Sequence, residues 1–373
     1  MSLALFSVVV FVVCAFGAVE AKGNAPWAEA EATAACEPTG PQLSTTVVTG
    51  GFPVRDPSTA PEKHTIAVLE DLQLCAGRPH RFLGGIVATV SQNMLMGTDV
   101  RCVPTDGDVG TPQEQAARRS AYSTRNHGDP ANEPEAIAVR WLFEPDRDGT
   151  YDCEVRGWGQ TSKGTSGSMT IVPHQNTKLS VSGVEDGGRE WVQDADRYLC
   201  NDPEAQDPVC GTATYVLRDE FQADADARSI DVYAGVEASI CAREYKDCTD
   251  TTAGFGDFVV GTELSVTQLS NDGGTGPCDG AQTHVDELTT RVAGAGQLNH
   301  TKIHQAFDAP IPVVVNSDCS RTFAIGVRAE YLMDDPDNPN HGGLVEGRIP
   351  DGLPTDPEAL NRYYTSAMAT NNF

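Results

Sequence analysis

Two groups of metal-ligating residue types are the first candidates for chemistry in this sequence. His300 and His304 are four residues apart, and Asp308 follows four residues later. On a helix the three side chains would share one face and could hold a metal ion. The competing interpretation is a pair of surface histidines beside the N-glycosylation acceptor Asn299, which Thr301 completes. We favour the second interpretation and expect neither a metal nor a cofactor at these residues.

The second group, Asp335, Asp337 and Asn340, resembles an oxygen-rich calcium loop in its residue types. Pro336 and Pro339 interrupt the alternation of ligands that such a loop needs, and no glycine stands at the turn. We therefore expect no calcium site here.

The cysteines indicate an oxidising compartment. An apolar run from Leu3 to Ala18, followed by the small-x-small sequence at 19–21, predicts a signal peptide over residues 1–21 and a secreted protein. Cys14 lies in that segment, which leaves ten of the eleven cysteines. An even number of cysteines in a secreted chain predicts five disulfides. No later segment is long and apolar enough to suggest a membrane span.

The charge excludes whole classes of partner. The formal net charge of the 373 residues is −27 and the sequence pI is near 4.5. A nucleic-acid-binding protein needs a basic patch to neutralise phosphates, and docking to anionic membranes needs one as well. The charge identifies no ligand, because both a salt-rich environment and a basic partner are compatible with it.

The residues around these candidates predict an all-β fold. Short runs rich in β-branched residues are bounded by Gly, Pro, Asp or Asn, as in strands joined by turns. The runs are 65–69, 85–90, 136–139, 178–181, 258–260 and 311–315. Only 112–120 and 358–367 suggest short helices. Residues 22–46 read as a lead segment.

One segment resembles a known family. Residues 153–161, CEVRGWGQT, resemble the C-x-V-x-G-W-G-x-T segment of trypsin/chymotrypsin-like serine proteases. Other segments follow in the family's order over roughly residues 47–260, including 84–87, 93–102 and 136–139. The resemblance implies two antiparallel six-stranded Greek-key barrels over 47–260. Residues 261–373 are then either an appended β module or the rest of the same domain after a large insertion.

The resemblance does not extend to the catalytic residues. The position of the family's histidine is Arg101, and a guanidinium cannot act as a general base. The position of its aspartate is Ala136. The position of its serine is Thr214 in one alignment frame and Gln282 in another. The resemblance therefore implies a catalytically inactive homologue, since losing members of the triad removes most of the rate.

The resemblance also implies disulfides. The family brackets its histidine strand in a way that would pair Cys75 with Cys102, and Cys210 with Cys241 comes second. Separately from the resemblance, if residues 261–373 are an appended β module, Cys278 with Cys319 would close it.

The leading functional hypothesis is a secreted, non-catalytic module that binds an extracellular protein, such as another hydrolase or a cell-surface glycoprotein, as a decoy, inhibitor or adhesion partner. The alternatives are an active secreted serine endopeptidase with misaligned motifs, and an extracellular β-sandwich module for carbohydrate or structural contact.

Overall fold

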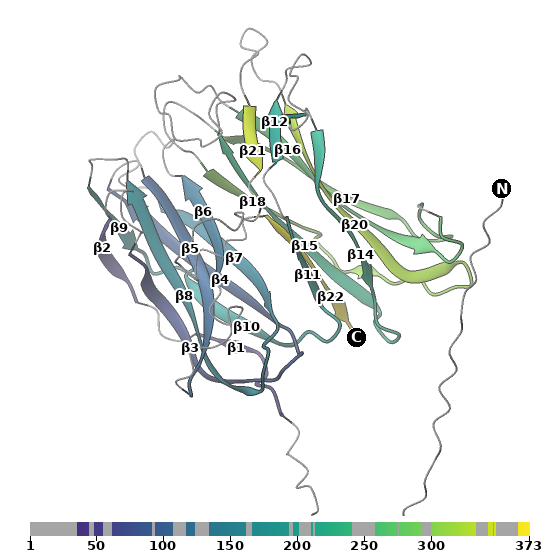
Figure 1. Ribbon diagram of the computed structural model, residues 1–373, viewed down its shortest axis with the longest axis horizontal. Coiled ribbons are helices and arrows are strands. Elements are labelled where there is room, and N and C mark those ends of the chain that lie inside the picture. Colours follow the sequence, from purple (N-terminus) through teal and green to yellow (C-terminus); the bar gives the residue numbers. More distant parts are fainter. Residues whose placement is uncertain are drawn as a thin grey trace, which may run out of the picture. The chain divides into compact units, whose positions relative to one another are not determined.

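The computed structural model consists of β-strands and their connections (Figure 1). It describes residues 36–44, 48–54, 62–91, 94–106, 117–123, 134–161, 166–193, 197–200, 210–211, 213–240, 258–274, 276–292, 300–332, 342–345, 347 and 365–373. The predicted signal peptide and most of the predicted lead segment lie outside these residues. None of the described residues forms a helix of a length and hydropathy that could cross a membrane.

The first half of the chain forms two sheets. One has the order β1-β10-β4-β9-β2, with β7 also paired to β4. Its strands are β1 (Gln42–Leu43), β2 (Gly50–Val54), β4 (His80–Val90), β7 (Glu135–Phe143), β9 (Gly167–Ile171) and β10 (Lys178–Val184). The other has the order β3-β8-β5-β6. Its strands are β3 (His64–Leu74), β5 (Met94–Pro104), β6 (Ala117–Ser123) and β8 (Gly149–Thr161).

The second half forms two more sheets. One has the order β11-β22-β15-β21-β12-β13, with β18 and β19 also paired to β15. Its strands are β11 (Arg189–Val192), β12 (Arg197–Cys200), β13 (Cys210–Gly211), β15 (Ser229–Ile240), β18 (His300–Ala306), β19 (Ile311–Pro312), β21 (Gly342–Val345) and β22 (Ser366–Asn372). The other has the order β14-β20-β16-β17. Its strands are β14 (Ala213–Gln222), β16 (Phe258–Ser270), β17 (Thr283–Val292) and β20 (Cys319–Leu332).

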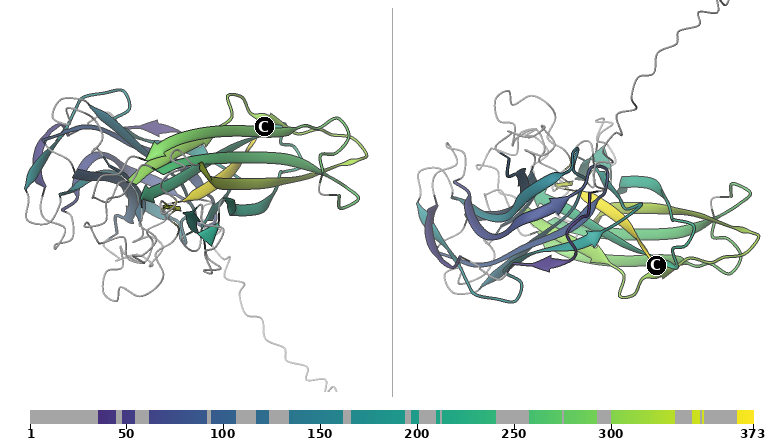
Figure 2. Two further views of the ribbon diagram at one scale, coloured as in Figure 1. Left: turned by 90° about the horizontal axis from the view of Figure 1, so that it is seen from above. Right: turned by 90° about the horizontal axis from the view of Figure 1, so that it is seen from below.

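Each pair of sheets encloses its own hydrophobic core. The first core gathers side chains from both sheets of the first half, such as Phe82, Ile86 and Val100. The second gathers side chains such as Val236, Leu264 and Val327. Two sheets packed over one core are a β-sandwich, so the described chain forms two sandwiches, one drawn in purple to teal and one in teal to yellow (Figure 2).

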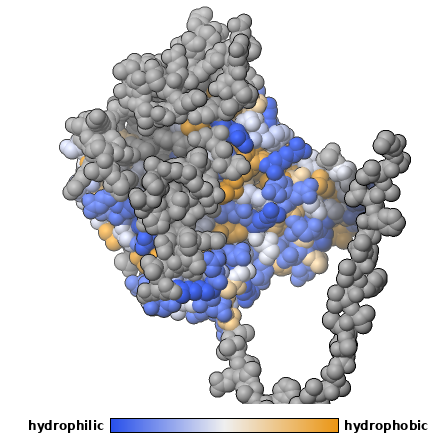
Figure 3. All heavy atoms as spheres, viewed as in Figure 1, coloured by the Kyte–Doolittle hydropathy of each residue, from blue (hydrophilic) through white to orange (hydrophobic). Residues whose placement is uncertain are grey.

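The period-2 pattern of the sequence explains these faces. Along β16, Val260, Leu264 and Val266 are fully buried, whereas Glu263 and Ser265 between them are partly exposed. Successive side chains of a strand point to opposite faces, so such alternation buries one face only. On the surface seen in Figure 3, hydrophilic residues are interspersed with hydrophobic ones, as on a chain that gathers its apolar side chains inside.

The all-β prediction is confirmed, but the sheets are not closed barrels. In the described part of the chain, no sheet closes on itself. Two sheets are open series, such as β3-β8-β5-β6, and the other two branch at β4 and β15. The predicted runs 65–69, 85–90, 136–139, 178–181 and 258–260 all lie in strands, whereas 311–315 is a strand only at Ile311–Pro312. The predicted helices at 112–120 and 358–367 are wrong where they are described, because 117–120 and 366–367 are strand.

The two cores also place the division of the chain elsewhere than the sequence does. The first core ends at Val181 and the second begins at Trp191. Residue 260 lies inside β16, and β14 pairs with β20 across that predicted boundary. Residues 213–240 therefore share their sheets with the segment that the sequence separates as 261–373.

Candidate functional site

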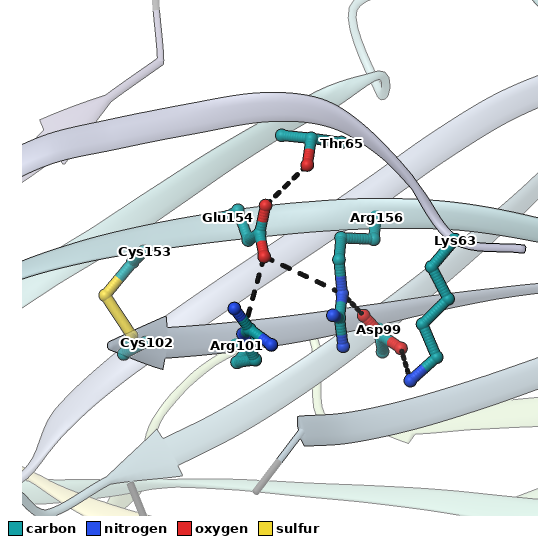
Figure 4. Close-up of polar contacts among 8 residues, drawn as sticks. All are labelled: Lys63, Thr65, Asp99, Arg101, Cys102, Cys153, Glu154 and Arg156. Carbon is teal, nitrogen blue, oxygen red and sulfur yellow. Dashed lines mark hydrogen bonds and ion pairs between the residues drawn. A yellow bond between two sulfur atoms is a disulfide. The ribbon is translucent and has the colours of Figure 1, made fainter. Parts of the chain in front are cut away.

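Arg101 lies in a block of charged side chains on the sheet β3-β8-β5-β6. Asp99 and Arg101 are two residues apart on β5, so their side chains leave the same face of the strand. In the antiparallel register Asp99 stands opposite Arg156 of β8, and Arg101 stands opposite Glu154. The pairing of β5 with β8 therefore places two cations and two carboxylates side by side (Figure 4).

Asp99 is the buried centre of this block. Arg156 donates from Nε to Asp99 Oδ1 across 2.6 Å, and Lys63 Nζ lies 3.2 Å from Asp99 Oδ2. Asp99 is completely buried and Arg156 nearly so. A buried carboxylate is tolerated when cations and hydrogen bonds replace the water it has lost. Asp99 meets this condition through both of its oxygens.

Glu154 is the second acceptor in the block. Arg101 Nε lies 3.4 Å from Glu154 Oε1, and the hydroxyl of Thr65 donates to Glu154 Oε2. Arg156 Nε is 3.9 Å from the same Glu154 Oε1. The guanidinium of Arg101 thus neutralises a carboxylate (Figure 4). These contacts hold the strands together, and Arg101 itself cannot act as a general base, because a guanidinium keeps its proton.

Trp158 of the GWG segment packs within the protein. It stands opposite Gly97 in the β5–β8 register, and it is almost fully buried. A Cβ atom on Gly97 would come within 1.9 Å of the Trp158 ring. The glycine leaves the space that the indole fills, so this tryptophan is a packing residue rather than a platform for a ligand.

The other positions of the degenerate triad do not join Arg101. Ala136 lies on β7, in the opposite sheet of the first sandwich. Thr214 lies on β14 and Gln282 just before β17, both in the second sandwich, where β20 and β16 separate the two strands. Gln282 borders a cavity of about 300 Å³ that Gln268, His284 and Phe323 also line. Among the described residues, no serine or cysteine lines that cavity.

The predicted histidine pair lies on a strand. Residues 300–306 form β18, so the helical spacing that would bring His300 and His304 together is absent. The Nδ1 atom of His304 instead makes a short hydrogen bond with the hydroxyl of Tyr233. Asp335, Asp337, Asn340 and Asn299 lie outside the described residues, and so do the side chains of Cys210 and Cys241.

Three disulfides are described, and they correct one predicted pairing. Cys75 pairs with Cys36, and Cys102 pairs with Cys153, so the predicted Cys75–Cys102 bridge is wrong. Cys102 and Cys153 are direct cross-strand partners, with Cα atoms 4.0 Å apart. The lead segment brings Cys36 to Cys75, since Thr39 N donates to Gln73 O beside it. The predicted Cys278–Cys319 bridge is confirmed.

The outer face of the sheet β14-β20-β16-β17 carries a row of side chains that the sequence analysis missed. Tyr215, Arg328, Glu263 and Glu287 come from four neighbouring strands, and each stands opposite the next in the register. Tyr215 is 49% exposed, which is unusual for a large aromatic side chain on a strand. The sequence does carry a sign of this face. In β16 and β20, the residues that alternate with the buried apolar positions point to it.

Glycines make this face shallow. A Cβ atom on Gly326 would meet Ser265 Oγ at 2.9 Å and the Tyr215 ring at 3.3 Å, so the ring lies across the glycine. Beyond Arg328, a groove of about 180 Å³ is lined by Gly261, Glu263, Glu287, Thr289 and Glu330, among others. Arg328 Nη2 is paired with Glu330 Oε2 at 3.1 Å. We call the face formed by Tyr215, Ser265, Glu263, Glu287, Arg328 and Glu330 the outer-sheet face.

Comparison with known proteins gives distant similarities. No family model and no curated protein matches the chain. A structure of infectious bursal disease virus Gt strain aligns with 12% identity and a TM-score of 0.22 over 90% of this chain and 77% of that chain. A structure of broad bean stain virus aligns with 9% identity and a TM-score of 0.24 over 82% and 90% of the two chains.

The tandem CBM22 domains of Paenibacillus barcinonensis Xyn10C align with 7% identity and a TM-score of 0.21 over 90% of this chain and 95% of that chain. At these values the similarities identify neither a family nor a function. The resemblance to serine proteases therefore stays a prediction.

Proposed function

We propose that this chain is an extracellular, non-catalytic β-sandwich protein that binds neutral carbohydrate on the outer-sheet face. The single observation that supports this proposal is the half-exposed ring of Tyr215 lying across Gly326, in line with Arg328, Glu263 and Glu287. The ring offers an apolar surface, and the charged side chains beside it offer hydrogen bonds.

The residue types of the face suit a sugar. Sugar hydroxyls both donate and accept hydrogen bonds, and the C–H face of a pyranose ring packs against an aromatic ring. Glu263, Glu287 and Glu330 accept, Arg328 donates, and the hydroxyl of Ser265 does both. Three carboxylates against the guanidinium of Arg328 and that of Arg218, which lies over the Tyr215 ring, leave a net negative charge, so a neutral glycan fits this face better than a sulfated or uronic one.

The absence of catalysis belongs to the same proposal. Arg101 and Ala136 stand where the resembled family has its base and its orienting carboxylate, and Arg101 is paired with Glu154. The described disulfides and the predicted signal peptide support an extracellular location. The chain would then act by binding alone. A protein partner, as the family resemblance implies, remains the second proposal.

A glycan array followed by calorimetry tests the carbohydrate proposal. We expect binding to one or more neutral oligosaccharides, and we expect Tyr215→Ala to weaken it by about tenfold or more, since a lost aromatic contact is worth roughly 1.4 kcal/mol. Phe373→Ala is the matched control, because Phe373 is also exposed but lies at the chain end. Equal binding by Tyr215→Ala and the unmodified protein would overturn the proposal.

A fluorophosphonate probe tests the absence of catalysis. We expect no covalent labelling of any serine, with an active trypsin-like protease as the positive control. Labelling of a serine in the folded protein would show that the chain is a hydrolase and that its motifs are misaligned.

A further inference from the structure

A cavity unrelated to the outer-sheet face lies where strands of the two sandwiches meet. Its volume is about 230 Å³. The first sandwich contributes Arg81 of β4 and Arg140 of β7, and the second contributes side chains of β15 and β22 with the residues that follow β18. The lining includes Arg81, Arg140, Asp231, Tyr233, Phe307 and Met368. Two cations, one carboxylate and an apolar wall therefore surround one small space.

Arg140 is the charged group with no acid partner in this cavity. Its guanidinium carbon lies 4.1 Å from the centre of the Tyr233 ring, in a cation–π contact. Among the described residues, no carboxylate forms an ion pair with it. An arginine presents five N–H donors in a planar fork that matches a carboxylate, and stacking on an aromatic ring holds that fork in place.

Arg81 and the Tyr233 hydroxyl already have partners, whereas the hydroxyl of Thr370, which also lines the cavity, has no hydrogen-bond partner among the described residues. Arg81 Nη2 lies 3.2 Å from Glu185 Oε1, and Arg81 Nη1 lies 3.8 Å from Asp231 Oδ2. The Tyr233 hydroxyl is engaged by His304. Burial raises the pKa of Tyr233 well above its ordinary value, so this phenol stays neutral. The guanidinium of Arg140 is thus the group left to receive a negative charge.

We propose that this cavity binds a small monocarboxylate with an apolar body, its carboxylate on Arg140 and its body against Phe307 and Met368. The volume suits a molecule the size of benzoate or hexanoate, because it falls below the range of about 300–1,000 Å³ of drug-sized ligand pockets. The Asp231 carboxylate in the same lining disfavours dianions such as phosphate. The charge-assisted contact with Arg140 would favour a carboxylate over a neutral ligand of the same shape.

Calorimetry and ligand-observed NMR with benzoate, hexanoate, benzamide and inorganic phosphate test this proposal on the full chain. We expect benzoate or hexanoate to bind. Benzamide, which is the neutral isostere of benzoate, should bind at least about tenfold more weakly, and so should phosphate. Arg140→Gln should weaken carboxylate binding by about tenfold or more, and Arg140→Lys should weaken it less. Arg218→Gln is the control, since Arg218 is an exposed arginine beside Tyr215.

Several results would overturn the proposal. They are no binding of either carboxylate, equal binding of benzoate and benzamide, and unchanged binding by a folded Arg140→Gln. If Arg140→Gln does not fold, Met368→Trp, which fills the cavity from its apolar side, must abolish binding instead. Tyr215→Ala should leave carboxylate binding unchanged, so failure of the carbohydrate proposal and failure of this one are distinguishable.

Discussion

Arg156 and Asp99 are direct cross-strand partners, joined across 2.6 Å between Nε and Oδ1 on a face of the sheet where both are buried. Lys63 reaches the other oxygen of the same carboxylate. The position that resembles a catalytic histidine, Arg101, lies two residues from Asp99 and is held by Glu154. A segment that resembles part of a catalytic apparatus thus contributes to an ion network that links β3, β5 and β8.

Replacing Asp99 by Asn tests the energetic weight of this network. The change leaves the charges of Arg156 and Lys63 without their carboxylate, and breaking a buried pair in this way costs roughly 3–5 kcal/mol. We expect the free energy of unfolding in urea to fall by about that amount. The control is Asp219→Asn, because Asp219 pairs with Arg189 at 3.8 Å on the exposed surface.

The exposed control pair should contribute at most about 1 kcal/mol. Equal losses for Asp99→Asn and Asp219→Asn would contradict the assignment of the network as a buried one.

Gly97→Ala tests the packing of Trp158. A Cβ atom at residue 97 would overlap the indole ring at 1.9 Å, so the ring or the strand must move. Overpacking of this kind costs roughly 1–3 kcal/mol. We expect a lower melting temperature and a changed near-ultraviolet circular dichroism spectrum from Trp158. Gly149→Ala is the matched control on β8, because its nearest atom lies 3.6 Å away. An unchanged spectrum and melting temperature for Gly97→Ala would contradict the described packing.

The strands could be predicted from the sequence, and their partners could not. Runs such as 85–90 and 136–139 are apolar and β-branched, which is a local property, and both lie in strands. Whether β4 pairs with β7 in an open sheet or in a barrel depends on contacts between distant residues, which periodicity does not encode. The choice left open for residues 261–373 has the same cause, and the pairing of β14 with β20 across residue 260 favours the rest of one domain over an appended module.

The outer-sheet face likewise depends in part on the local sequence and in part on pairing between distant strands. The alternation in β16 indicates that Glu263 and Ser265 face away from the core, and that much is readable from the sequence. Tyr215 joins them only because the register shifts between Tyr215 and Leu217, which places the ring opposite Arg328. A bulge of this kind has no clear local signal, so a candidate site built across four strands needs the structure.

Peptide mapping without reduction tests the corrected disulfides. We expect crosslinked peptides that join Cys36 to Cys75, Cys102 to Cys153 and Cys278 to Cys319. Cys102 and Cys153 face each other across β5 and β8, so their pairing requires no movement of the backbone. Each crosslinked mass should disappear after reduction. A peptide that joins Cys75 to Cys102 would contradict the described pairing and would favour the one implied by the protease resemblance.

The stability of the chain should fall between pH 7.5 and 5.5, in part because of His80. This residue is completely buried at the start of β4, and burial lowers the pKa of its ring below the ordinary value of 6.5. In that interval the unfolded chain takes up a proton that the folded chain does not, so acidification favours unfolding. The contribution is present above pH 6.5 and is lost as the pH falls toward the folded pKa, by at most about 1.4 kcal/mol per pH unit.

His304 acts in the same direction, since burial, followed by the charges of Lys302 and Arg140, lowers its pKa to about 3. Replacing His80 by Phe removes one of the two titrations, so urea unfolding at intervals of half a pH unit should show a smaller loss of stability on acidification than in the unmodified protein. His174→Ala is the control for the loss of a histidine side chain, because His174 is exposed. Profiles of equal slope for His80→Phe and the unmodified protein would mean that His80 takes up its proton in the folded state as readily as in the unfolded one, and its burial would then be too shallow to exclude the charged ring.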